Sequence, residues 1–273
     1  MKTLPVALQV FSVRDDAEKD FKGTMQRVKE MGYDGVELAG LYGHTAEQIR
    51  KMLDEVGIRA ISAHIPYMDL IADTEGIIDQ YMAIGCEYIV IPYLNDEYRP
   101  GVENFGEVLE AIAKIGAVCK QKGVTLLYHN HDFEFVTMED GSFGLDYMYS
   151  HVSPEYLQTE LDCCWVKVAG QDPAAYIRKY AGRCPVVHLK DYRGEKSEHM
   201  YELIGWEEDR KDEVKSTFEF RPVGYGVQDM PSILAASVES GADWVVVEQD
   251  DSLDRPPMEA AAMSREYLKS LGW

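Results

Sequence analysis

Residues 121–135 read QKGVTLLYHNHDFEF, and this stretch contains the pattern that decides the fold. A segment of helical character ends at Gly123, an apolar strand follows at once, and the strand closes on His129. A continuous apolar run is typical of a strand buried on both faces of a parallel sheet. The same order of helix, glycine and strand recurs at Gly32, Gly57, Gly85 and Gly241. Repeated units of this kind predict an α/β fold.

Eight apolar, β-branched runs are predicted to be strands. They lie at about 5–11, 34–38, 59–64, 87–92, 124–129, 158–162, 185–189 and 244–248. Eight βα units in 273 residues predict one (β/α)₈ TIM-barrel domain that spans residues 1–273. A doubly wound open sheet is the alternative, but the turn after the first strand, QVFSVRDD, lacks the glycine-rich phosphate loop of such folds.

One long polar segment interrupts the repeat, at about 193–222. Because it follows the seventh strand, we expect it to lie over the mouth of the barrel. A lid, a partner surface and a tolerated insertion all remain open for this segment.

Composition restricts the classes of partner. The net charge of −21 argues against nucleic acid and anionic membranes as general partners. No apolar run approaches the ~20 residues of a membrane span, and the N-terminus does not resemble a signal peptide. The five cysteines form no CxxC pair, so we interpret them as reduced thiols in a cytoplasmic protein.

Charged side chains close the last four strands. Asp162 ends the sixth strand, His188 lies in the seventh, Glu248 ends the eighth, and Glu134 comes just after the fifth. Any one of them alone is more simply a capping, surface or core group. Together, three carboxylates and one imidazole at the same end of a barrel predict a site for Mn²⁺, Co²⁺, Mg²⁺, Fe²⁺ or Zn²⁺.

The chain resembles a known family over nearly its whole length. The most specific stretches are LQVFSVRDD, MGYDGVEL, SAHIP, YHNHDFEF, ELDCCWVKVAGQDPAAYI, VVHLKDYR, VGYGVQDMPSIL and VVVEQD. They resemble the sugar phosphate isomerase/epimerase family of xylose isomerase-like TIM barrels, which includes inosose dehydratases, ketose 3-epimerases and endonuclease IV-like members. The resemblance places the family's metal ligands at Glu134, Asp162, His188 and Glu248. Many members instead carry a Glu inside the fifth strand, where this chain has His129 or Asn130.

The resemblance also implies a reaction. A metal holds vicinal oxygens of a keto sugar or cyclitol, and a base removes the proton α to the carbonyl. Return of the proton gives isomerisation or epimerisation, and loss of a β-leaving group gives dehydration or another elimination. The epimerases imply acid–base roles for Glu134 and Glu248. His129 and His131 share a strand face, and this pair resembles the dehydratase and lyase branch. Lys190 is a further catalytic candidate.

Several residues are expected to contact the substrate. Trp165 stands where the epimerase pattern has a substrate-binding His, which weakens the case for a free-ketose epimerase. Arg193 is a candidate for binding an anionic group, with a solvated loop charge as the alternative. His64 shares a face with Ser62 and is expected to contact a substrate hydroxyl. Weaker candidates are Glu37 and Gln9, for which hydrogen bonding within the barrel is an equal alternative.

We therefore expect a metal-dependent enzyme acting on a small sugar or cyclitol, with a homo-oligomer as an option for its assembly. One alternative is a non-catalytic sugar-binding protein or complex subunit that keeps the barrel. Another is an endonuclease IV-like phosphodiesterase, which the net charge of −21 disfavours because DNA requires a basic groove.

Overall fold

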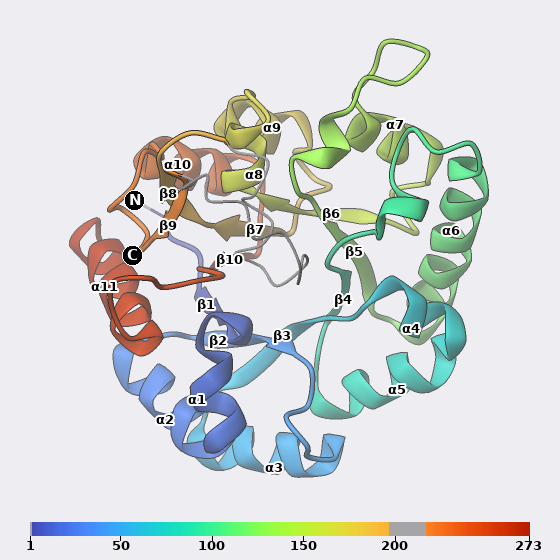
Figure 1. Cartoon of the computed structure of the whole chain (residues 1–273). Coiled ribbons are helices and arrows are strands. Elements are labelled where there is room, and N and C mark those ends of the chain that lie inside the picture. The colour runs from blue at the N-terminus through green and yellow to red at the C-terminus, as the bar shows by residue number, and fades with distance from the viewer. Residues whose placement is uncertain (1, 197–216) are drawn as a thin grey trace, which may run out of the picture.

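The computed structural model describes residues 2–196 and 217–273. Eight parallel strands close into a barrel in the order β1-β10-β7-β6-β5-β4-β3-β2, and helices surround it (Figure 1). The strands are β1 (Val6–Gln9), β2 (Gly35–Ala39), β3 (Arg59–His64), β4 (Tyr88–Ile91), β5 (Thr125–His129), β6 (Gln158–Asp162), β7 (Val186–Leu189) and β10 (Trp244–Val247). The predicted TIM barrel is confirmed, and the pairing of β1 with β10 excludes an open sheet.

The helices follow the strands as predicted. They are α1 (Arg14–Lys19), α2 (Phe21–Met31), α3 (Ala46–Val56), α4 (Tyr67–Ala72), α5 (Thr74–Ile84), α6 (Phe105–Lys122), α7 (Gly144–His151), α8 (Cys163–Val168), α9 (Pro173–Lys179), α10 (Met230–Glu239) and α11 (Pro257–Ser270). Left-handed glycines end α2, α3, α5 and α6, as the sequence pattern predicts. Before Gly241 the capping residue is instead Ser240. In the described parts of the chain, no helix has the length and apolar character needed to cross a bilayer.

A small antiparallel pair follows the seventh barrel strand. It consists of β8 (Asp191–Arg193) and β9 (Glu219–Arg221). The segment predicted as an insertion at 193–222 thus starts and ends in this pair, and its residues 197–216 lie outside the described residues. The carboxylate of Asp191 accepts backbone hydrogen bonds from Tyr192, Gly224, Gly226 and Gln228 at 2.9–3.1 Å. One buried side chain therefore joins β8 to the turn that follows β9.

The barrel interior is divided into an apolar and a polar half. The apolar half is a cluster of Ala7, Ile61, Tyr88, Val90, Leu127, Val186, Trp244 and Val246. The polar half lies at the carboxyl ends of the strands, where His129 is in register with Glu160, and Asp162 with His188. Because neighbouring parallel strands are in register, polar side chains far apart in sequence come to one level of the barrel.

Two glycines of α6 allow a matched test of helix packing. A Cβ at buried Gly116 would lie 1.9 Å from the carbonyl oxygen of Tyr156, whereas a Cβ at exposed Gly106 would meet nothing within 4 Å. We expect Gly116→Ala to lower the free energy of unfolding by about 1–3 kcal/mol through overpacking. The control Gly106→Ala should leave it unchanged or raise it by up to about 1 kcal/mol. Urea denaturation of both variants measures this, and equal effects would contradict the packing assigned to Gly116.

Candidate active site

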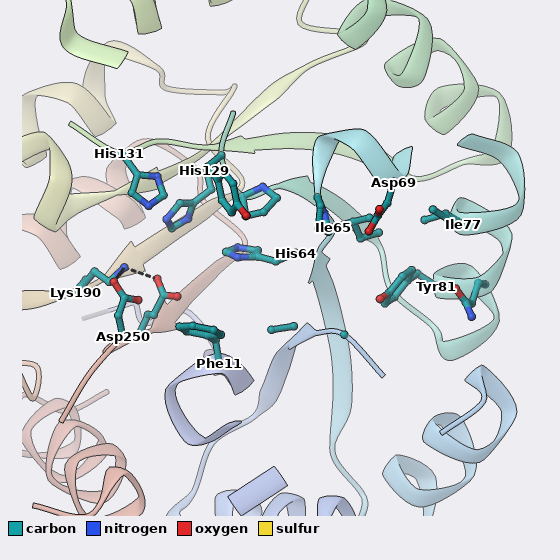
Figure 2. Close-up of a pocket in the computed structure, with 17 residues that line it drawn as sticks. Phe11, His64, Ile65, Asp69, Ile77, Tyr81, His129, His131, Lys190 and Asp250 are labelled. Carbon is teal, nitrogen blue, oxygen red and sulfur yellow. Dashed lines mark ion pairs between the residues drawn. The ribbon is translucent and has the colours of Figure 1, made fainter. Parts of the chain in front are cut away.

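A pocket of about 500 Å³ opens at the carboxyl end of the barrel (Figure 2). One side of the pocket is formed by His64, His129, His131, Lys190, Glu248 and Asp250. These residues come from or directly follow β3, β5, β7 and β10. The pocket is therefore at the face of the barrel where TIM-barrel enzymes place their active sites.

We call this side of the pocket the charged wall. Four side chains meet beside it in a geometry that fits a metal ion. One donor atom each of His129, Asp162, His188 and Glu248 lies within 4.8 Å of the others. The His188 Nδ1 and Glu248 Oε2 atoms are 3.0 Å apart, and His129 Nε2 is 3.6 Å from Asp162 Oδ2. Asp162 Oδ2 is buried and accepts no hydrogen bond from the described residues. Two imidazoles and two carboxylates are a suitable ligand set for Mn²⁺, Fe²⁺, Co²⁺ or Zn²⁺.

A second set of polar side chains lies beside the first. Glu160 Oε1 is within 2.7–3.0 Å of three imidazole nitrogens, His64 Nε2, His129 Nδ1 and His188 Nε2. Glu37 Oε1 lies 2.8 Å from His188 Nε2 and 3.0 Å from His64 Nε2. His129 and His188 thus face a carboxylate of this set with one nitrogen and Asp162 or Glu248 with the other. Carboxylates in this position fix the tautomer and ring orientation of metal-binding histidines.

The protonation states follow from the surrounding charges. Burial and the neighbouring imidazoles lower the pKa of His129 well below its usual range. Burial alone would lower the pKa of His188, but the carboxylates Glu160 and Glu37 outweigh it and raise that pKa. A metal ion would therefore meet a neutral His129 and displace a proton from His188.

Lys190 neutralises part of the charge at the pocket wall. Its Nζ lies 2.9 Å from both Glu248 Oε2 and Asp250 Oδ2 and 3.4 Å from Asp162 Oδ2. Burial opposes the charged form of Lys190, but these carboxylates raise its pKa. Burial raises the pKa of Asp250 to about 7, against the opposing effect of Lys190. Asp250 is therefore a carboxyl group whose pKa suits proton transfer near neutral pH.

The predicted residue Glu134 is not brought into this cluster. It lies in the 3₁₀ turn η3 (Phe133–Phe135), where its carboxylate accepts a hydrogen bond from the Tyr128 hydroxyl and another, of 2.8 Å, from the His131 amide. The member of the cluster from the fifth strand is His129. The chain turns after β5, so residues beyond His129 no longer follow the alternation of the strand.

Of the other residues predicted to contact the substrate, some line the pocket in the structure and others do not. His64 and His131 line the pocket, and the His131 ring stacks on Phe133 at 5.0 Å. Gln9 donates a 2.8 Å hydrogen bond to Glu37 inside the barrel, so these two residues belong to the internal network. Trp165 is fully buried beside Phe218 and Phe220, and Lys190 Nζ lies 5.4 Å from its ring. Arg193 is exposed and pairs with Glu219, which leaves it outside the pocket lining.

Two residues of the site, Glu160 and Asp250, were assigned no role in the sequence prediction. Each lies two positions from a predicted ligand, Asp162 or Glu248, and therefore on the same face of its strand or just beyond it. The period-2 alternation of strands was the signal that could have identified both.

The barrel with a potential metal cluster at its mouth can be compared with known proteins. The model of the family described as "Xylose isomerase-like TIM barrel" matches residues 25–271, and the chain belongs to this family. An inosose dehydratase of Clostridium beijerinckii is 24% identical over 279 residues, covering 92% of this chain and 90% of that protein. One from Geobacillus kaustophilus is 23% identical over 274 residues, covering 90% of this chain and 86% of that protein.

Solved structures share the fold at lower identity. A sugar phosphate isomerase/epimerase from Parabacteroides distasonis is 20% identical with a TM-score of 0.79, covering 97% of this chain and 98% of that one. An L-ribulose 3-epimerase is 15% identical with a TM-score of 0.69, covering 98% of this chain and 94% of that one. The family assignment in the sequence analysis is confirmed.

The buried carboxyl group of Glu134 predicts a pH-dependent stability. Burial raises its pKa from 4.5 to about 7. Between these two pH values the folded chain keeps a proton that the unfolded chain releases, so the contribution of Glu134 to stability falls as pH rises. We expect the free energy of unfolding of Glu134→Gln, relative to wild type, to rise by about 3 kcal/mol between pH 4.5 and 8. Urea titrations at both pH values measure this difference, and a difference that does not vary with pH would contradict the assignment.

Proposed function

We propose that the protein is a divalent-metal-dependent enzyme that removes a proton α to the carbonyl of a keto sugar or cyclitol. The observation that carries this proposal is the convergence of His129, Asp162, His188 and Glu248 beside the pocket. The names of the relatives support it, since inosose dehydratases and an L-ribulose 3-epimerase act on substrates of these classes. The products are those of isomerisation, epimerisation or β-elimination.

The proposed ligands are His129, Asp162, His188 and Glu248. A divalent cation held by these four residues would supply Lewis-acid stabilisation of the negative charge that develops on the substrate. Glu160 and Glu37 hold the histidine rings through the nitrogens that face away from Asp162 and Glu248. This arrangement transfers to His129 the role that the sequence prediction gave to Glu134.

Groups of the charged wall carry out the proton transfer. His131 lines the pocket, and burial together with Lys190 lowers its pKa, so its neutral imidazole is available to accept a proton. Asp250, with a pKa of about 7, is placed to take up or return a proton on the same wall. Lys190 orients Glu248 and Asp250 through its two 2.9 Å ion pairs.

Metal binding distinguishes His129 from Glu134 as the ligand. We expect wild-type protein to bind a divalent ion, with Mn²⁺ and Zn²⁺ as the probes. His129→Ala should weaken that binding by at least about 100-fold, because a direct ligand is lost. Isothermal titration calorimetry of the metal-stripped protein measures the affinity.

Glu134→Gln is the matched control, because it alters a buried polar group in the turn that follows β5 and changes none of the proposed ligands. It should retain an affinity within about threefold of wild type. The opposite pattern, with loss of metal in Glu134→Gln and retention in His129→Ala, would restore Glu134 as the ligand. Circular dichroism of each variant checks that the barrel is intact.

Solvent deuterium exchange tests the reaction. Metal-loaded protein is incubated in D₂O with a panel of ketoses, inososes and 3-keto-glycosides, and NMR follows each substrate. We expect deuterium to enter α to the carbonyl, because enolisation precedes both epimerisation and elimination. The structures of the products separate these outcomes.

Two controls define the interpretation of that assay. EDTA-treated protein and Asp162→Asn should show no exchange above buffer. Exchange that persists without metal would contradict the proposed metal dependence. If metal binds but no substrate in the panel exchanges, the non-catalytic sugar-binding alternative is favoured.

A further inference from the structure

The pocket extends well beyond its charged wall. In Figure 2, His131, Lys190 and Asp250 lie on one side, and Ile65, Asp69, Ile77 and Tyr81 lie on the other, with His64 between them. The second side is built from the end of β3, from α4 and from α5. These elements contribute none of the proposed metal ligands. The pocket is therefore divided between a reactive half and a half without an assigned role.

This second half is mainly apolar. Ile65, Pro92 and Tyr81 are buried, and Ile77 is partly buried beside them. Ala39 and Pro66 continue the same surface. An apolar group that enters this half leaves water for an apolar surface, which favours binding in proportion to the area covered.

The charges of the lining disfavour an anionic group there. Among the described residues that line the pocket, Lys190 is the one lysine or arginine, and three carboxylates already lie around it. The carboxylate on the apolar side is that of Asp69, which would repel a phosphate or carboxylate. A sugar phosphate therefore meets no lysine or arginine of the described residues in this half of the pocket.

The size of the pocket also favours a ligand that is larger than a single sugar ring. Its volume is about 500 Å³, which is within the range of about 300–1,000 Å³ that buries ligands of drug size. A single sugar ring is much smaller than such ligands. A sugar bound at the reactive half would leave the apolar half for a further substituent.

We propose that the apolar half is a subsite for an uncharged aromatic or aliphatic group linked to the sugar, so that the substrate is a glycoside with an apolar aglycone. This inference rests on the proposed function for the placement of the sugar at the reactive half. Pockets of this kind combine a mainly apolar lining with a few polar groups that set the orientation of the ligand. Ile65, Ile77 and Tyr81 select the aglycone, and the charged wall receives the sugar.

Equilibrium binding to metal-loaded protein tests the subsite without turnover. The probes are the phenyl and methyl glycosides of glucose and of 3-keto-glucose in both anomeric forms, with glucose 6-phosphate as the anionic comparison. We expect each phenyl glycoside to bind at least about tenfold more tightly than its methyl partner, and glucose 6-phosphate to bind more weakly than the phenyl compounds. Equal affinities within the phenyl–methyl pairs would overturn the proposal.

Two substitutions of the same kind locate the effect. Ile77→Ser makes the apolar half polar and should reduce the preference for phenyl over methyl to less than about threefold. Ile71→Ser is the control, because Ile71 on α4 is 44% exposed and does not line the pocket. It should keep the wild-type preference. A preference that is equal in the two variants would place the phenyl group elsewhere and overturn the proposal.

A probe without a sugar covers the case in which glucose is the wrong ring. Saturation-transfer NMR with phenol should give a signal in wild type and in Ile71→Ser that is lost in Ile77→Ser. No signal from phenol or from any phenyl glycoside would contradict the subsite. A phenyl preference without deuterium exchange would retain the subsite and reject the proposed reaction. Deuterium exchange without a phenyl preference would retain the proposed reaction and reject the subsite.

Discussion

The concentration of negative charge inside the barrel is the constraint on which the rest of the site depends. Five carboxylates of the site are buried, namely Glu37, Glu160, Asp162, Glu248 and Asp250, and the last three lie within 3.4 Å of Lys190. Removing isolated charges from water costs several kcal/mol each, so such a group persists only with close positive partners. Lys190 and the imidazoles of His64 and His188 supply these partners at 2.7–3.4 Å.

The same charge balance connects stability to function. The carboxylates and imidazoles of this cluster can exchange bound protons for a divalent ion, which carries a larger charge. Glu160 has the central part in this arrangement, because its Oε1 atom approaches three imidazole rings. We infer that the histidines are held rigidly whether a proton or a cation balances the carboxylates. Apolar side chains below them in the barrel prevent water from entering from the other end.

Sequence patterns were sufficient for the barrel and for part of the site. The eight strands follow from continuous apolar runs, and the cluster members Asp162, His188 and Glu248 follow from their positions at strand ends. Glu134 was placed from the family resemblance, and strand alternation could not position it because the chain leaves β5 after His129 and enters a 3₁₀ turn. Glu160 was overlooked because it lies inside its strand, where a charge is unexpected until the register of β5 and β6 is known. The apolar side of the pocket combines Ile77 of α5 with Ile65 and Pro92, which directly follow β3 and β4, and no local period connects them.

The carboxylate of Asp191 has a consequence for how this barrel can diversify. It joins β8 to the turn at Gly224, Gly226 and Gln228, and it immediately follows Lys190 in the chain. The two ends of the segment that connects β8 to β9 are therefore held together by these hydrogen bonds, whichever residues lie between them. Additions or deletions within residues 197–216 would then leave the lysine of the pocket in place. The position of Lys190 is thereby uncoupled from the length of that part of the sequence.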